Sequence, residues 1–162
     1  MKYLFSYTLL SIGLLACAQS KNVIKTAYGV YQVHLPGNIA VDKNGNEIAS
    51  RDTINFIYIE TANNEIKWDM AWKNGKNYSI ISTLINSKLY DAGTKKLTGK
   101  NMLLKVSEDN KLWQLRLIPS DKNVEAPSNI LPGEIIIRGS FNGKKIYQNI
   151  NSLTELNSIP SV

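Results

Sequence analysis

The amino-acid sequence predicts an all-β protein, and we expect an antiparallel β-sandwich of about nine to ten short strands joined by hairpins. Asn-Gly pairs tolerate the positive φ angles of tight hairpin turns, and they separate apolar runs at Asn44-Gly45, Asn74-Gly75 and Asn142-Gly143. Apolar and polar residues alternate over residues 66–72, which is the period of a half-buried strand. After the N-terminal segment, Gly and Asn interrupt the chain too often for a long helical run. A lipocalin-like closed β-barrel is the alternative arrangement of the same strands.

The first predicted strands lie on either side of a turn. Residues 28–35 are rich in β-branched and aromatic side chains, and Pro36-Gly37 ends this run. Residues 39–41 and 47–49 flank the first Asn-Gly pair, so we expect them to form a small hairpin.

The middle of the chain carries the most apolar strands. Residues 53–61 and 77–85 are apolar on both faces, which indicates strands that are covered on both sides over part of their length. Between them, the alternation over residues 66–72 places Trp68 and Trp72 on one inward face.

The predicted strands of the C-terminal half are shorter. We expect residues 102–106 and 112–118 to form a hairpin around residues 107–110, after a Lys- and Gly-rich connection over residues 86–100. Residues 120–132 are the longest predicted loop.

Two or three further strands follow this loop. Residues 134–138 and 144–150 are expected to pair across the third Asn-Gly turn. Residues 153–156 form a last short predicted strand, and Pro160 ends any pairing.

The N-terminal segment has the order of a secretory signal peptide. Lys2 provides positive charge, residues 3–15 are apolar, and small residues follow at Ala16 and Ala18. The apolar run is shorter than the ~20 residues that a membrane-spanning helix needs. Leu14-Leu15-Ala16-Cys17 resembles the lipobox of bacterial envelope lipoproteins, and the resemblance is limited to this segment.

That resemblance implies a lipid anchor. In the lipoprotein family the Cys becomes the new N-terminus and carries acyl chains, so Cys17 would attach the protein to the outer membrane on its periplasmic side. The predicted organisation is then a signal peptide over residues 1–16, a lipidated N-terminus and tether over 17–26, and one all-β domain over 27–162. Cleavage after Ala18 is the alternative, and it would give a soluble periplasmic protein.

Composition limits the possible partners. The net charge is +6, but the Lys residues are scattered and form no basic arm, so nucleic acid is not an expected partner. We expect a Lys-rich surface near anionic membrane lipids, together with a protein or glycan partner. The single Cys excludes an intramolecular disulfide. Neither a cofactor nor an oligomeric state is predicted.

No catalytic or metal-binding motif is complete. His34 is the only histidine, which excludes zinc sites built from several His and Cys ligands, and no Gly-x-Ser-x-Gly motif is present. Residues 42–46 begin like a calcium-binding loop, but Thr53 stands where the motif requires Glu. Three carboxylates near one turn would suit a glycosidase only if two of them flanked a sugar. They are Glu60, Glu65 and Asp69.

Aromatic side chains are the remaining candidates for ligand binding, because they can stack on sugar rings or line a pocket. They are Trp68, Trp72, Trp113, Tyr58 and Tyr78. The competing interpretation is that these residues form the core. We therefore expect a non-catalytic, membrane-anchored binding or structural module, with a lipocalin-like carrier of a small apolar ligand as the alternative. A glycan-binding or glycan-hydrolysing protein is the third hypothesis.

Overall fold

A computed structural model describes residues 23–35, 40–45, 47–48, 52–62, 65–127 and 130–160. Within these ranges the chain forms twelve strands, and no helix there is long and apolar enough to cross a membrane. The predicted signal peptide 1–16 and the predicted lipidation site Cys17 lie outside the described residues. The strands are β1 (Ile24–Leu35), β2 (Ala40–Val41), β3 (Glu47–Ile48), β4 (Asp52–Thr61), β5 (Lys67–Lys73), β6 (Lys76–Ile85), β7 (Leu89–Thr94), β8 (Asn101–Lys105), β9 (Lys111–Pro119), β10 (Ile135–Phe141), β11 (Lys144–Ile150) and β12 (Leu153–Pro160).

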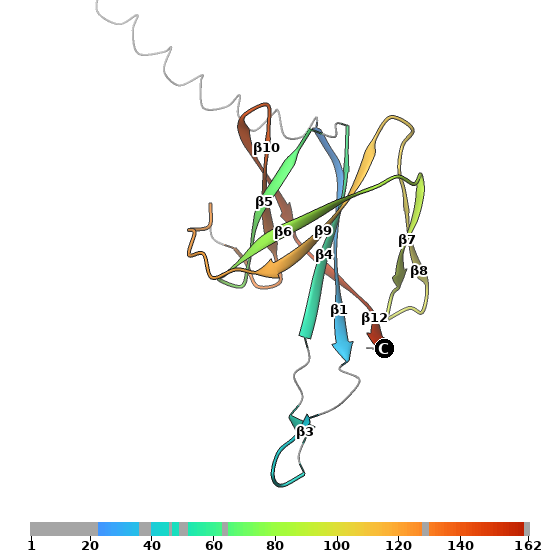
Figure 1. The fold of residues 1–162 in the computed structure, drawn as a ribbon. Helices are drawn as coiled ribbons and strands as arrows, with labels where there is room; N and C mark the ends of the chain where they lie inside the picture. The colour runs from blue at the N-terminus through green and yellow to red at the C-terminus, as the bar shows by residue number, and fades with distance from the viewer. Residues whose placement is uncertain are drawn as a thin grey trace, which may run out of the picture.

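Eight strands form one sheet that curls into a half-barrel (Figure 1). Their order is β11-β10-β5-β6-β9-β4-β1-β12, and all neighbours are antiparallel except β1 and β12, which are parallel. The all-β prediction is confirmed. The prediction of a purely antiparallel arrangement was wrong, because β12 pairs with β1 in the parallel direction.

The two edge strands of this sheet, β11 and β12, are consecutive in the chain and are linked only by Asn151 and Ser152. Because this link spans at most about 11 Å, the sheet must curl until its edges approach each other there. Gly29 of β1 lies at the approach: an added Cβ would lie 2.4 Å from Leu153 Cδ2 and 2.7 Å from Ile150 Cγ2. A residue with a side chain at this position would require Leu153 and Ile150 to move.

The remaining strands form two small sheets, β2–β3 and β7–β8. β8 pairs with β7, whereas β9 lies between β6 and β4 in the main sheet. The predicted hairpin between residues 102–106 and 112–118 was therefore wrong, and the predicted connection over 86–100 contains β7. Alternating apolar residues such as Met102 and Leu104 identify a strand, but they do not identify its partner.

Apolar side chains cover both faces of the main sheet, as the middle strands predicted. The inner face of the half-barrel holds the largest core, whose central members are Ile57, Ile59, Leu115, Leu117, Ile135 and Ile137. The hairpin β7–β8 covers one part of the outer face, and its core includes Val30, Tyr58, Met102, Leu104 and Leu156. Val124, Ala126 and Ile130 of the long loop cover Met70, Trp72 and Ile136. Two stacked layers, as in a sandwich, therefore occur only where this hairpin and loop lie on the outer face.

A β-bulge in β5 separates the two tryptophans that the alternation placed on one face. Met70 lies opposite Arg138 and Trp68 lies opposite Gly139, so Asp69 is the extra residue. Trp68 consequently packs in the inner core, and Trp72 packs in an outer one. The prediction of a shared face was wrong because a bulge shifts the alternation by one residue.

Two of the three Asn-Gly turns have the predicted left-handed angles, and the first lies within the predicted hairpin. Asn74-Gly75 has φ angles of 49° and 71°, and Asn142-Gly143 has 50° and 72°, which are the left-handed angles of a type I′ hairpin. β2 and β3 pair on either side of Asn44-Gly45. Two strands are longer than predicted. β1 begins at Ile24, inside the predicted tether, and β12 continues to Pro160 beyond the predicted end at residue 156.

Candidate functional site

Polar side chains line the inner face of the half-barrel at the end where β1 finishes and β4 begins. Asn55 shares the inner face of β4 with Ile57, because alternate residues of a strand point the same way. Tyr31 lies opposite Asn55, and Glu155 lies opposite Tyr31 on the other side. Two lysines complete what we call the polar row, which consists of Lys96, Glu155, Tyr31, Asn55 and Lys73.

At one end of the polar row, two donors hold the Glu155 carboxylate. Lys96 Nζ lies 2.6 Å from Oε1, and the Tyr31 hydroxyl donates to Oε2 at 3.2 Å. The hydrogen bond from Lys96 lowers the pKa of Glu155, whereas partial burial and the hydrogen bond to Glu155 raise the pKa of Tyr31. At neutral pH the row therefore presents a charged carboxylate beside a neutral phenol.

The other end of the polar row is a half-buried lysine. Lys73 Nζ donates to Asn55 Oδ1 at 2.6 Å, and Asn55 is only 5% exposed. Burial lowers the pKa of Lys73. Lys76 lies directly opposite Lys73 across the Asn74-Gly75 turn, so a second ammonium group shares this face. Two ion pairs with N–O distances of 4.0 Å or less occur among the described residues, Lys96–Glu155 and Arg138–Asp69. Neither of them involves Lys73 or Lys76.

A cleft of about 730 Å³ adjoins the polar row. It lies between the edge strand β12 and the turn after β7, and its lining includes Tyr31, Leu153, Glu155, Lys95, Lys96 and Leu97. The Lys96 backbone N–H donates to the Glu155 carbonyl at 3.0 Å, which fixes the turn against the edge of the sheet. Leu97 at the turn is 96% exposed. The volume falls within the ~300–1,000 Å³ that is typical of small-molecule sites.

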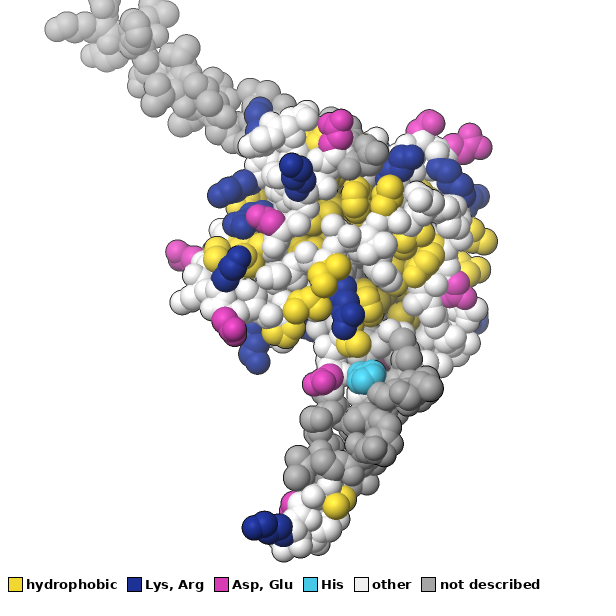
Figure 2. Space-filling view, in the orientation of Figure 1, with side chains coloured by type: hydrophobic (Ala, Val, Ile, Leu, Met, Phe, Trp, Pro, Cys, Tyr) yellow, Lys and Arg dark blue, Asp and Glu magenta, His cyan; other side chains and the backbone are white. Residues whose placement is uncertain are grey.

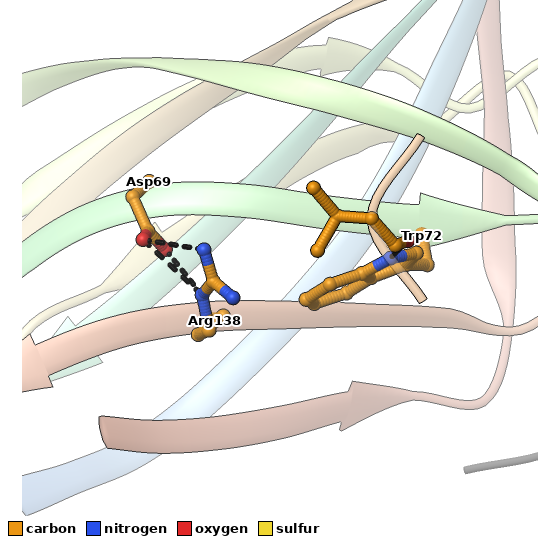
Figure 3. Close-up of polar contacts among 4 residues, drawn as sticks. Asp69, Trp72 and Arg138 are labelled. Atoms are coloured by element: carbon orange, nitrogen blue, oxygen red, sulfur yellow. Dashed lines mark hydrogen bonds and ion pairs between the residues drawn. The ribbon is translucent and has the colours of Figure 1, made fainter. Parts of the chain in front are cut away.

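A second polar cluster lies on the outer face, where Arg138 of β10 binds Asp69 of the bulge (Figure 3). Arg138 Nη2 lies 2.8 Å from Asp69 Oδ2, and Nε lies 2.9 Å from Oδ1. The guanidinium carbon is 5.4 Å from the centre of the Trp72 ring, and Trp72 Nε1 donates to the Val124 carbonyl at 2.8 Å. The hydrogen bonds that Arg138 donates to Asp69 raise the pKa of Arg138. This cluster is internally satisfied, which suits a structural role.

Most of the predicted aromatic candidates are buried. Tyr58, Trp68 and Trp72 are 3%, 7% and 2% exposed, while Trp113 and Tyr78 pack against the inner core as partly buried residues. Trp113 Nε1 donates to Thr61 Oγ1 at 3.1 Å, but Trp68 Nε1 is buried and has no acceptor among the described residues. The structure therefore does not bring these five residues together around one opening.

The predicted acidic candidates are separated. Glu60 is 6% exposed and accepts hydrogen bonds from the Ser107 backbone at 3.0 Å and from the Asn110 side chain at 2.6 Å. Burial opposes ionisation of Glu60, but these hydrogen bonds lower its pKa overall. Asp69 lies on β5, and β9 and β6 separate that strand from β4, which carries Glu60. Glu65 is exposed before β5.

The other residues considered as candidate ligands or bases, His34 and Asp42, lie at a strand end and in a turn. His34 lies opposite Asp52 at the end of β1. Asp42 Oδ1 accepts the Asn44 backbone N–H at 2.8 Å, which is a turn interaction. Within the described part of the chain, no group of three or more His, Cys, Asp or Glu residues could hold a metal ion.

The outer face of the sheet also exposes apolar side chains. Figure 2, in the orientation of Figure 1, shows hydrophobic side chains over the centre of the molecule and charged side chains mostly around them. Ile81 on β6 is 56% exposed and lies opposite Arg116 of β9. Scattered exposed apolar residues are ordinary on protein surfaces, so this face alone does not define a site.

The polar row was not identified from the sequence. Tyr31, Asn55, Lys73 and Glu155 lie on four strands that are far apart in the chain, and only the sheet order brings them together. The alternation along each strand gives the face of a residue but not its neighbours. The one available sequence signal was Lys73 and Lys76 flanking Asn74-Gly75, because such residues lie opposite each other in a two-residue hairpin.

The fold and the polar row thus define an all-β protein with a curled sheet, an apolar inner core and a row of polar side chains at one end. Comparison with protein-family models, with curated proteins and with solved structures finds no match to this chain.

Proposed function

We propose that the protein is a non-catalytic binding module of the bacterial cell envelope, anchored through lipid on Cys17. In this proposal the curled sheet acts as an open barrel, not as a sandwich, and it binds a small polar ligand at its open end. The observation that carries the proposal is the polar row beside a cleft of about 730 Å³.

The packing of the inner face favours a ligand at the opening over an apolar ligand in the interior. Ile57, Ile59, Leu115, Ile135 and Ile137 are each 0% exposed and pack together in the inner core. An apolar ligand in the interior would have to displace these contacts, at a cost of ~2–5 kcal/mol for each large side chain that it displaced. The cleft instead is lined by residues that carry hydroxyl, carboxylate and ammonium groups, among them Tyr31, Glu155 and Lys96.

The chemistry of the polar row favours binding over catalysis. Glu155 has its pKa lowered and Tyr31 has its pKa raised, so neither group is poised to transfer a proton near neutral pH. Glu60 and Asp69 hold a turn and an arginine, respectively. These groups suit recognition of a ligand that leaves unchanged.

The anchor is tested by growing cells with labelled palmitate. We expect label on the wild-type protein in the outer-membrane fraction and none on the Cys17→Ser variant. An unlabelled wild-type protein that is free in the periplasm would overturn the anchored part of the proposal.

The ligand site is tested by nuclear magnetic resonance with glucose and glucuronate as probes. We expect the largest shifts at Tyr31, Leu97 and Glu155, and weaker binding in the Tyr31→Ala variant. Ile81→Ser is the matched control on the outer face. Shifts centred on residue 81 instead would overturn the location.

A further inference from the structure

We infer that Lys73 and Lys76 recognise an oxyanion, and that the ligand is a small acidic saccharide whose hydroxyl groups lie along the polar row. This inference rests on the proposed function and names the ligand class for the same site. It starts from the two lysines on the inner face of the β5–β6 hairpin.

Lys73 is a half-buried cation with an incomplete environment. Its one hydrogen-bond partner among the described residues is the Asn55 amide oxygen at 2.6 Å, which is neutral. A buried ammonium group is normally paired with a carboxylate, because burial without a counter-ion is costly. An oxyanion supplied by a ligand would complete this environment.

Lys76 makes the local charge more positive. It lies opposite Lys73 in the hairpin, and like charges at opposed positions repel each other. Asp121 lines the same pocket as Lys76 and Lys122, but no ion pair at 4.0 Å or less joins Asp121 to either lysine. The repulsion between Lys73 and Lys76 falls when one oxyanion binds both ammonium groups.

The rest of the polar row suits a saccharide. Tyr31 offers an aromatic ring and a hydroxyl group, and Glu155 has acceptor capacity beyond its bonds to Tyr31 and Lys96. Sugar hydroxyl groups require such mixed donors and acceptors, and sugar rings stack on aromatic faces. A fatty acid would also provide a carboxylate, but its chain would need the space that the inner core occupies.

The test is calorimetric titration of the purified full chain in detergent with sodium glucuronate, glucose 6-phosphate and glucose. We expect both acidic sugars to bind at least about tenfold more tightly than glucose, as a charge-assisted hydrogen bond implies. A separate arm uses protein reconstituted without detergent into vesicles that contain phosphatidylglycerol, and we expect no competition from this lipid.

Three variants assign the effect to the two lysines. Lys73→Met and Lys76→Met should each remove most of the preference for acidic sugars over glucose. Lys73→Arg should retain the preference, which distinguishes lost charge from lost folding. Lys105→Met removes the same charge from the exposed face of β8 and should change nothing.

The outcomes separate the two proposals. Equal affinity for glucose and glucuronate at the polar row overturns the oxyanion inference and leaves the proposed function intact. Binding of neither sugar type overturns the saccharide inference, and binding centred elsewhere overturns both proposals. Competition by the vesicles would assign the oxyanion to a lipid headgroup and overturn the saccharide.

Discussion

Arg138 and Lys73 are both largely buried cations on the same sheet, but their surroundings differ. On the outer face, Arg138 has a carboxylate in two-point contact and an aromatic ring beneath it. On the inner face, Lys73 has one amide oxygen and a second lysine opposite. The pKa of Arg138 is raised by its hydrogen bonds to Asp69, and the pKa of Lys73 is lowered by burial.

This difference indicates a structural role for Arg138 and makes Lys73 a candidate for ligand binding. Arg138 contributes to stability because its charge is matched inside the protein. Burial lowers the pKa of Lys73, and no carboxylate among the described residues forms an ion pair with it. Groups with perturbed pKa values of this kind are concentrated at binding and catalytic sites. The following experiments test this difference, beginning with the curl on which both environments depend.

Gly29→Ala should have the largest effect. The added methyl group would meet Leu153, Ile150 and the Ser152 carbonyl, so we expect a loss of about 3 kcal/mol in the free energy of unfolding. Urea denaturation measures it. Gly75→Ala is the control, because its methyl group meets nothing within 4 Å and only its φ of 71° opposes the change, at about 1 kcal/mol. Equal losses would mean that the sheet edges are not closely packed at Gly29.

Arg138→Met should destabilise the protein by about 1–2 kcal/mol, since it removes the ion pair and the contact over Trp72. Asp69→Asn should cost less, because Asp69 is 54% exposed and its interaction is screened by water and salt. Thermal unfolding at low and high salt measures both. An unchanged stability of Arg138→Met would contradict the structural role of Arg138.

Replacing Lys73 and Asn55 together should have an effect of the opposite sign. In the Lys73→Met/Asn55→Leu variant both polar partners become apolar, so no group is left without a partner, and we expect a gain of up to about 1 kcal/mol. Chemical denaturation near neutral pH measures the change. A loss similar to that of Arg138→Met would show that Lys73 is a structural cation after all.

The smallest expected effect is a difference in pH dependence. The folded protein releases the Lys73 proton more readily than the unfolded chain, whose lysine has a pKa of 10.5. The free-energy cost of burying the charged Lys73 is therefore present at neutral pH and decreases as pH rises toward 10.5. The free energy of unfolding of the wild type should consequently rise relative to that of Lys73→Met in that range.

Tyr58 has the opposite effect on the pH dependence of stability, and it has this effect in both the wild type and Lys73→Met. Burial raises its pKa to about 12, so stability falls as pH rises between 10 and about 12, and this loss cancels when the two proteins are compared. Denaturation curves at several alkaline pH values measure the difference. Parallel pH profiles would contradict the uncompensated burial of Lys73.

Local features of the fold were predictable from the sequence, whereas the strand partners were not. Asn74-Gly75 and Asn142-Gly143 require left-handed angles, so their turns could be located directly. The pairing of β8 with β7, and of β12 with β1, depends on long-range packing that no local pattern encodes. The bulge at Asp69 likewise shifted the face of Trp72, because a single extra residue leaves no mark in the alternation.

The candidate site was less predictable than the fold for a related reason. Large aromatic residues are predicted as ligand-binding candidates because they can stack on a ligand. Trp68, Trp72 and Tyr58 are core residues here, because burying their apolar area stabilises the fold. Lys73 and Asn55 are unremarkable in a Lys- and Asn-rich chain. Their importance comes from a contact across strands that are not neighbours in the sheet.

The parallel pairing of β12 with β1 has a consequence for biosynthesis. Gly29 and Leu153 are opposed residues that lie far apart in the sequence, so the main sheet stays unfinished until β12 has been synthesised. Contacts of such wide sequence separation form slowly. A late-completing fold of this kind leaves one edge of β1 unpaired until β12 is available.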